Sequence, residues 1–200
     1  MYTFLYKKRA GENGKRGFTL IEMMVAVSLF SVVMVIASSA LLTVIDADRR
    51  ARAEASVLDN LDTALESMTR SIRVGSHYYC GVGSPGAVND CGSGGTMFTF
   101  EPYGGNVSTS DQWIYSWSSS GPNAGEILRS TNGGASYLPL TATSSGLSIN
   151  SLRFYVTGST EGDGYQPKVT ISVRGVAGPK VTDQVPFEVE TTLTQRLYDL

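Results

Sequence analysis

One carboxylate, Glu22, lies within an apolar run of 28 residues that extends from Phe18 to Ile45. An ionised carboxylate at the membrane centre costs about 2.5–3.5 kcal/mol on insertion scales, and less near the start of a span. After Gly17 the next basic side chain is Arg49, about 40 Å farther along a helix. We therefore expect Glu22 to form an ion pair with another molecule, or with an amine newly created by cleavage. The alternative is that Glu22 is simply a charge tolerated at the membrane interface.

The two cysteines, Cys80 and Cys91, enclose ten residues. An even number of cysteines in a domain outside the cytoplasm predicts a disulfide, with free thiols as the alternative. We expect no metal site, because there is no second cysteine pair and His77 is the only histidine. The sequence also lacks a phosphate-binding loop and a G-x-S-x-G elbow, so we expect neither an enzyme nor a cofactor.

Two other motifs could bind ligands. Trp113, Tyr115 and Trp117 alternate, which places them on one face of a strand, where they would stack on sugars if exposed. We favour the alternative, that they are core or subunit-contact residues. The segment Glu161-Gly162-Asp163-Gly164 could offer calcium ligands, but it lacks the EF-hand pattern and is better interpreted as a hairpin tip.

The distribution of glycine, proline and charge along the chain indicates which elements carry these residues. Residues 18–74 contain no glycine or proline, whereas nineteen of the 22 glycines and all seven prolines lie from Gly75 onward. Residues 1–17 have a net charge of +4 and the remainder has −6. A basic head before an apolar run is typical of a chain handled by the membrane-export machinery. With 42% hydrophobic residues and no basic patch in the body, disorder and nucleic-acid binding are not expected.

The apolar run is long enough to cross a membrane. At about 1.5 Å per residue it covers roughly 42 Å, against roughly 30 Å of hydrocarbon. The basic head should stay in the cytoplasm, so residues after Ile45 should face outward. A buried core helix is one alternative, but the run is apolar on all sides. A removed secretory signal, cut near Ser38-Ser39-Ala40, is another, but its apolar region would be too long.

The helical pattern continues over residues 46–74. Apolar residues recur there at alternating spacings of three and four and predict one stripe packed under a sheet: Leu58, Leu61, Leu65, Met68 and Ile72. Six acidic and five basic residues occupy the other faces. They predict a solvated surface, or pairing with neighbouring subunits.

The rest of the chain, 75–200, predicts a β-rich head. We expect strands at 96–100, 112–118, 126–130, 136–140, 149–157, 168–174 and 185–193. The Asn132-Gly133 pair predicts a hairpin turn. The fold class is therefore α+β, with a long N-terminal α-helix packed on an antiparallel β-sheet.

The stretch Lys15-Arg16-Gly17-Phe18-Thr19-Leu20-Ile21-Glu22 resembles the processing motif of type IV pilins and type II secretion pseudopilins. The resemblance implies a pilin-like fold and a prepilin peptidase that cuts between Gly17 and Phe18 and methylates the Phe18 amine. It also implies that Glu22 helps to place each subunit by pairing with a free N-terminal amine. The chain departs from the family by its long leader and by lacking a proline in the apolar helix.

The head resembles minor pilins of the J-type pseudopilin kind, through residues 126–129, 151–156, 167–173 and 190–196. Together the resemblances imply a leader at 1–17, a transmembrane and filament-core helix at 18–45, an amphipathic helix at 46–74 and a globular head at 75–200. The implied partners are other pilin subunits, the prepilin peptidase, the assembly platform and the inner membrane. Nucleic acid would be contacted only indirectly, through a DNA-uptake pilus.

These resemblances predict a minor pilin or pseudopilin, anchored in the inner membrane with its head outside and later part of a surface or periplasmic filament. They do not distinguish between three machines that could use the protein: an adhesion or motility pilus, a DNA-uptake pilus and a secretion pseudopilus. A protein of another class is the alternative, namely a single-pass anchor whose head binds glycans.

Overall fold

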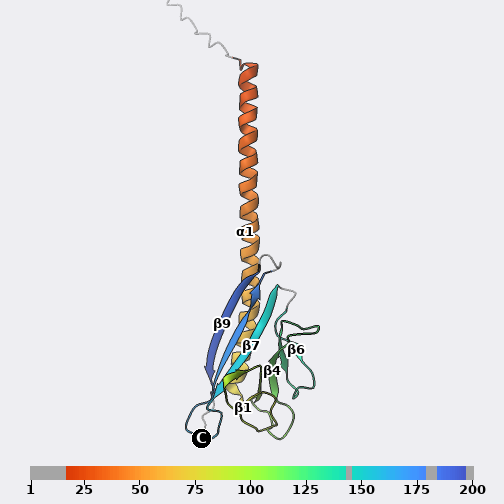
Figure 1. Cartoon of the computed structure of the whole chain (residues 1–200), viewed down its shortest axis with the longest axis vertical. Helices are drawn as coiled ribbons and strands as arrows, with labels where there is room; N and C mark the ends of the chain where they lie inside the picture. Colours follow the sequence, from red (N-terminus) through yellow and green to blue (C-terminus); the bar gives the residue numbers. More distant parts are fainter. Residues whose placement is uncertain (1–16, 143–145, 179–183, 197–200) are drawn as a thin grey trace, which may run out of the picture. The chain divides into compact units, whose positions relative to one another are not determined.

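The computed structural model describes residues 17–142, 146–178 and 184–196. Within these residues one helix, α1 (Leu20–Val74), is followed by nine strands (Figure 1). The chain divides into two compact units, with the boundary between Ala47 and Asp48. Residues 1–16, most of the leader expected at 1–17, lie outside the described residues.

The first unit contains the N-terminal part of α1. Its large apolar side chains are exposed throughout, from Phe18 at 77% to Val44 at 65%. No glycine or proline interrupts the helix, which explains its length. Among the described residues, α1 is the one helix long and apolar enough to cross a membrane.

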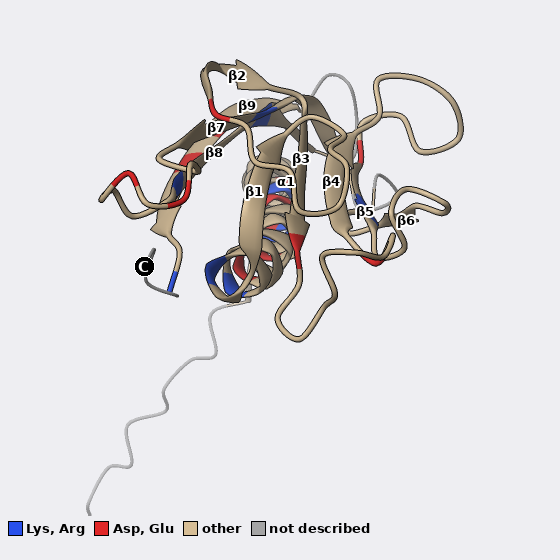
Figure 2. Cartoon of the chain, turned by 90° about the horizontal axis from the view of Figure 1, so that it is seen from below, with Lys and Arg blue, Asp and Glu red and all other residues tan. Residues whose placement is uncertain are grey.

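The second unit contains two antiparallel sheets beside the remaining part of α1 (Figures 1 and 2). One sheet has the order β1-β3-β4-β5-β6 and the other β2-β7-β8-β9. The strands of the first are β1 (Ser76–Cys80), β3 (Met97–Glu101), β4 (Trp113–Trp117), β5 (Ile127–Ser130) and β6 (Leu138–Pro139). Those of the second are β2 (Cys91–Gly95), β7 (Leu147–Thr157), β8 (Lys168–Ala177) and β9 (Val185–Thr194). The antiparallel α+β architecture expected from the sequence is confirmed and is pilin-like.

The core lies between α1 and the inner faces of both sheets. The large side chains that are fully buried there include Tyr78, Phe98, Phe100, Tyr115 and Phe154. Phe98 stacks on Phe100 and on Phe154, at centroid distances of 5.6 and 5.4 Å, so aromatic contacts join the two sheets.

The helix face toward this core differs by one position from the predicted stripe. Leu61, Leu65, Met68 and Ile72 are buried, but Leu58 is 47% exposed and Val57 is buried in its place. Ala64 is also buried, and it lies about 20° from Val57 but about 120° from Leu58 around the helix axis, so the buried face extends toward Val57. The prediction for Leu58 was therefore wrong.

Two strands were not predicted, and one was predicted too long. β1 and β2 fall in a region for which the sequence analysis predicted no strand, while the strand expected at 136–140 shortens to Leu138–Pro139. The head also has two sheets where one was expected. Pro139 limits β6, because proline donates no hydrogen bond to the ladder.

The C-terminal end of α1 is tied into the head through its last carbonyl groups. The Ile72 carbonyl accepts from the Gly75 amide at 3.0 Å and from the Tyr78 hydroxyl, and the Arg73 carbonyl accepts from the Arg196 amide at 2.7 Å. Such carbonyls have no partner within a helix, so these bonds satisfy them. A Cβ at Gly75 would overlap the Phe100 ring, so α1 stops where only glycine fits.

Candidate processing and assembly site

The Gly17–Phe18 bond lies just before the first turn of α1. Gly17, Phe18 and Thr19 are outside the helix and exposed. A Cβ placed on Gly17 would meet no atom within 4 Å. The bond is therefore accessible to another protein, and nothing within the described chain requires a glycine at position 17.

Thr19 and Glu22 cap the start of α1. The Thr19 hydroxyl accepts from the Glu22 amide at 3.3 Å, and a Glu22 carboxylate oxygen accepts from the Thr19 amide at a long 3.5 Å. This reciprocal arrangement is a capping box, which satisfies amides that the first turn leaves free. The capping role of Thr19 was not predicted from the sequence, although the Thr-x-x-Glu spacing could have revealed it.

The hydroxyl groups of the apolar segment are satisfied within α1 itself. Each donates to a backbone carbonyl three or four residues earlier, at 2.7–3.0 Å: Ser28, Ser31, Ser38, Ser39 and Thr43. Polar groups without partners are costly in lipid, and these bonds remove that cost. The segment is therefore suited to an apolar environment, with Glu22 as its one charged side chain.

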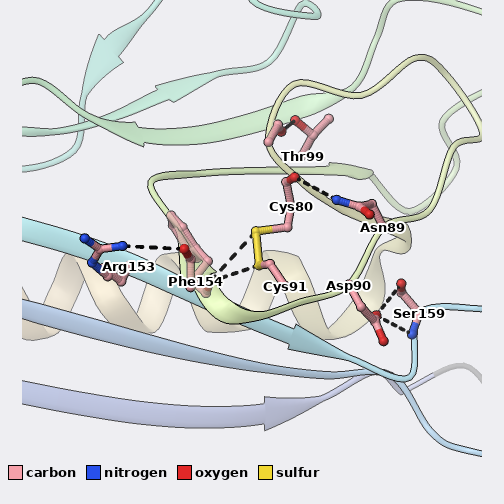
Figure 3. The surroundings of a disulfide bond; sticks show 10 residues. Cys80, Asn89, Asp90, Cys91, Thr99, Arg153, Phe154 and Ser159 are labelled. Atoms are coloured by element: carbon pink, nitrogen blue, oxygen red, sulfur yellow. Dashed lines mark hydrogen bonds between the residues drawn. A yellow bond between two sulfur atoms is a disulfide. The ribbon is translucent and has the colours of Figure 1, made fainter.

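In the head, a disulfide between Cys80 and Cys91 joins β1 to β2, and so one sheet to the other (Figure 3). The two Cα atoms are 5.9 Å apart. The Phe154 carbonyl oxygen lies 3.1 Å from Cys91 Sγ, a close contact rather than a hydrogen bond, because disulfide sulfurs carry no hydrogen. A Cβ at Gly95 would overlap Cys80 Sγ, which explains a glycine beside the bond.

Asp90, the residue before β2, fixes the loop that follows β7 (Figure 3). Its carboxylate accepts from the amides of Gly158 and Ser159, both at 2.9 Å, and from the Ser159 hydroxyl. Desolvation alone would raise the pKa of Asp90, but these hydrogen bonds outweigh it and lower the pKa below its ordinary value. This clamp was not anticipated from the sequence.

The aromatic residues of β4 serve the core. Tyr115 is fully buried, and Trp113 and Trp117 are half-buried against the core. The Trp117 indole donates to the Ile149 carbonyl at 2.8 Å, and the Arg129 guanidinium lies 5.2 Å from the Trp113 ring centroid. These contacts favour the core interpretation over an exposed sugar-stacking platform.

His77 lies beside the loop that contains residues 161–164. His77 Nε2 is 3.2 Å from a carboxylate oxygen of Glu161, and Nδ1 is 3.0 Å from the Ser76 hydroxyl. Asp163 accepts from the Tyr165 amide at 2.7 Å, as in a turn. Within the described ranges no group of three or more His, Cys, Asp or Glu side chains could hold a metal ion. This geometry favours the hairpin-tip interpretation of residues 161–164.

An accessible bond thus precedes an apolar helix that has a carboxylate in its first turn and is long enough to cross a membrane. Residues 13–38 match the family model described as the prokaryotic N-terminal methylation motif. The chain therefore carries the signature of type IV pilins and pseudopilins. Its apolar helix is consistent with anchoring in the inner membrane. No curated protein and no solved structure was found to match the chain.

Proposed function

We propose that this chain is a structural subunit of a type IV pilus or a related secretion pseudopilus. A prepilin peptidase cuts between Gly17 and Phe18 and methylates the new amine, and the mature chain then assembles with other pilin subunits. The methylation motif at 13–38 carries the proposal. The exposed Gly17–Phe18 bond and the exposed apolar part of α1 support it.

We assign the chain a minor rather than a major role in the filament. The apolar helix lacks the proline that major pilins often carry, and the strand pattern of the head resembles J-type pseudopilins. The Cys80–Cys91 bond suits a head outside the cytoplasm, where disulfides persist. In this role the heads form the surface or tip of the filament, and the apolar helices bundle in its core.

Glu22 has a different partner before and after cleavage. In the uncut chain its carboxylate accepts from the Thr19 amide within its own first turn. Cleavage creates a cationic amine at Phe18, which can approach the Glu22 of a neighbouring subunit. An ion pair between opposite charges is stronger in an apolar bundle than at a surface. Cleavage thus supplies the cation that the apolar segment lacks.

The Glu22→Ala substitution tests this role. Membrane insertion should be unchanged, because the substitution removes a charge from the apolar run. Incorporation into filaments should fall about tenfold or more, because a pair worth at least about 1.4 kcal/mol is lost. Membrane and sheared-filament fractions from cells that express the full chain would measure both quantities.

Two matched variants separate charge from shape. Glu22→Gln keeps the size of the side chain without its charge and should also incorporate poorly. Ser28→Ala lies in the same apolar segment, removes only an internal hydrogen bond and should incorporate normally. Normal incorporation of Glu22→Gln would contradict the pairing with an amine.

A further inference from the structure

The four strands at the edges of the two sheets differ in length and regularity. β1 and β2 each have five residues and a register shift in their pairing, and β6 has two residues, one of which is Pro139. β9 has ten residues, and all of them pair with β8 without a shift. Short, irregular or proline-containing edges resist the addition of another strand, whereas a long and regular edge favours it. Among the strands that the structure describes, β9 is therefore the edge most open to pairing.

The backbone of β9 presents alternate residues to its outer edge. In an antiparallel pair, successive residues alternate between bonding the neighbouring strand and pointing away from it. The Gln195 amide donates at 2.9 Å to the carbonyl of Pro167, just before β8, so odd-numbered residues bond β8. The Arg196 amide points the other way and donates to the Arg73 carbonyl of α1. Four even-numbered residues therefore direct both N–H and C=O outward, and we call them the open edge: Glu188, Glu190, Thr192 and Thr194.

The open edge borders free space. Within 17–142, 146–178 and 184–196, no strand lies beyond β9, and no backbone hydrogen bond joins the open edge to any residue outside the sheet. The side chains of all four residues are exposed. At the end of β9, an open pocket of about 430 Å³ lies between Arg196 and α1, where it is lined by Glu66, Thr69, Arg70, Arg73 and Val74. The backbone groups of the open edge are therefore accessible to another chain.

An exposed apolar side chain of α1 lies on the same side as the open edge. Leu58 is 47% exposed and lies about 20° from Thr69 around the helix axis, so it belongs to the flank of α1 that lines the pocket. It precedes Arg73 by fifteen residues, or about 22 Å, which corresponds to about seven residues of a strand. Because β9 and α1 run toward the same end (Figure 1), Leu58 lies near the level of Val189. Val189 and Phe187 are half-buried on the core side of β9, so a further strand would cover all three apolar side chains.

The charges of the open edge indicate which kind of strand fits. Glu188 pairs with Arg174 at 2.6 Å, but Glu190 makes no ion pair with any residue that the structure describes. Two copies of β9 paired in antiparallel about their middle would place the acids of one copy opposite those of the other. Like charges opposite each other destabilise a strand pair, whereas a basic residue opposite Glu190 would stabilise it. The open edge therefore suits a strand from a different protein better than a second copy.

We propose that the open edge binds an extended segment of a different protein as a fifth strand of the β2-β7-β8-β9 sheet. The segment alternates between apolar residues, which cover Leu58, Phe187 and Val189, and basic or hydroxyl residues, one of which faces Glu190. In this mode of recognition, main-chain hydrogen bonds provide affinity and alternate side chains provide specificity. The proposal is independent of the assembly proposed above, because it concerns the second unit alone.

Binding of a synthetic peptide to the purified full chain in detergent tests the proposal. The probe is fluorescent Thr-Lys-Val-Lys-Val-Lys-Val-Thr, which has the expected alternation, and its anisotropy reports binding. The same peptide with N-methylated central amides keeps its side chains but loses backbone donors. It should bind at least about tenfold more weakly, because each lost hydrogen bond weakens binding. Equal binding of the two peptides, or no binding of either, would overturn the proposal, and neither result depends on the folding of a variant.

A matched pair of variants at Thr192 tests the open edge itself. Thr192→Pro removes an outward N–H and places a ring there, and Pro186 shows that the same edge already accommodates a proline. Thr192→Ala keeps the N–H, and both variants lose the 2.9 Å hydrogen bond between the Thr192 and Thr170 hydroxyls. Thr192→Pro should weaken probe binding at least about tenfold, and Thr192→Ala should bind like the wild type. Equal binding by two variants with wild-type near-UV circular dichroism would overturn the proposal.

A charge reversal tests the chemistry of the bound strand. Glu190→Lys should weaken binding of the lysine probe about threefold to fivefold, because exposed ion pairs contribute modestly. It should also favour the same peptide with glutamate in place of lysine. Asp59→Lys makes the same change of charge at an exposed position about 100° from Leu58 around the helix axis and should bind like the wild type. Equal effects of the two substitutions would overturn the pairing of Glu190 with a basic strand.

Sedimentation of the chain without peptide tests the competing occupant, a second copy. The wild-type and Thr192→Pro chains should have the same mass, since the proposed strand comes from a different protein. A wild-type dimer that Thr192→Pro converts to a monomer would show that β9 pairs with itself, and the proposal would then be wrong.

Discussion

Gly17→Val should leave the leader attached to the chain. The peptidase must bring the backbone of residue 17 against its catalytic groups, and a branched side chain would hold that backbone away. A displacement of about 1 Å from the reactive geometry can cost about 100-fold in rate. Because a Cβ at Gly17 meets nothing within 4 Å in this chain, the substitution should not disturb the fold. The expected loss therefore arises at the peptidase.

The uncut chain is easily distinguished from its product. Loss of residues 1–17 from the 200-residue chain leaves 183 residues, so a denaturing gel of membranes resolves the two forms. Gly14→Val, in the same leader, is the matched control and should be cut normally. Equal cleavage of both variants would contradict a cut at Gly17. The uncut chain should also be missing from filaments, because no amine is available for Glu22.

The second large effect is expected from removing the disulfide. Replacing Cys80 and Cys91 by serine should lower the free energy of unfolding by about 3 kcal/mol, as expected for a closed loop of about twelve residues. The melting temperature of the head should then fall by about 10 °C. In this fold the same bond also joins β1 and β2, which belong to different sheets.

Thermal unfolding of the full chain in detergent measures this effect, with near-UV circular dichroism reporting on the packed aromatic core. Reducing agent should shift the wild-type chain to the melting temperature of the double-serine variant and leave that variant unchanged. Ser84→Ala, in the exposed loop that the disulfide encloses, is the matched control and should melt like the wild type. A double-serine variant with a wild-type melting temperature would contradict a stabilising role for the bond.

The long helix could be predicted because its causes are local. Residues 18–74 contain no helix breaker, and α1 occupies Leu20–Val74 of that window. Its limits depend on two specific contacts, the Thr19–Glu22 cap and the close approach of Gly75 to Phe100. The first has a sequence signature, whereas the second depends on β3 and could not be predicted locally.

Two edge strands of the head, β1 and β2, could not be predicted, for physical reasons. β2 has the sequence Cys-Gly-Ser-Gly-Gly, which lacks every residue type that favours strands. It pairs with β7 beside the disulfide, so long-range contacts define it. The strands β7, β8 and β9 were anticipated within about two to three residues at most ends, and alternating apolar residues at Val169, Ile171 and Val173 indicated β8.

The site near the N-terminus was named from the resemblance to the pilin processing motif. The matched methylation motif at 13–38 covers Gly17, Phe18 and Glu22, and the roles of these residues stay predictions. The charges of residues 46–74 were visible in the sequence only as a balanced set. Which of them pair, as Glu66 does with Arg70 and Asp48 with Arg52, required the structure.

The mass spectrum of the mature N-terminus in membrane and filament fractions tests the central claim most directly. We predict a chain that begins at Phe18, carries one methyl group on its terminal amine and lacks residues 1–17. An intact chain beginning at Met1, or a chain beginning at Leu41 after removal of a secretory signal, would contradict the account.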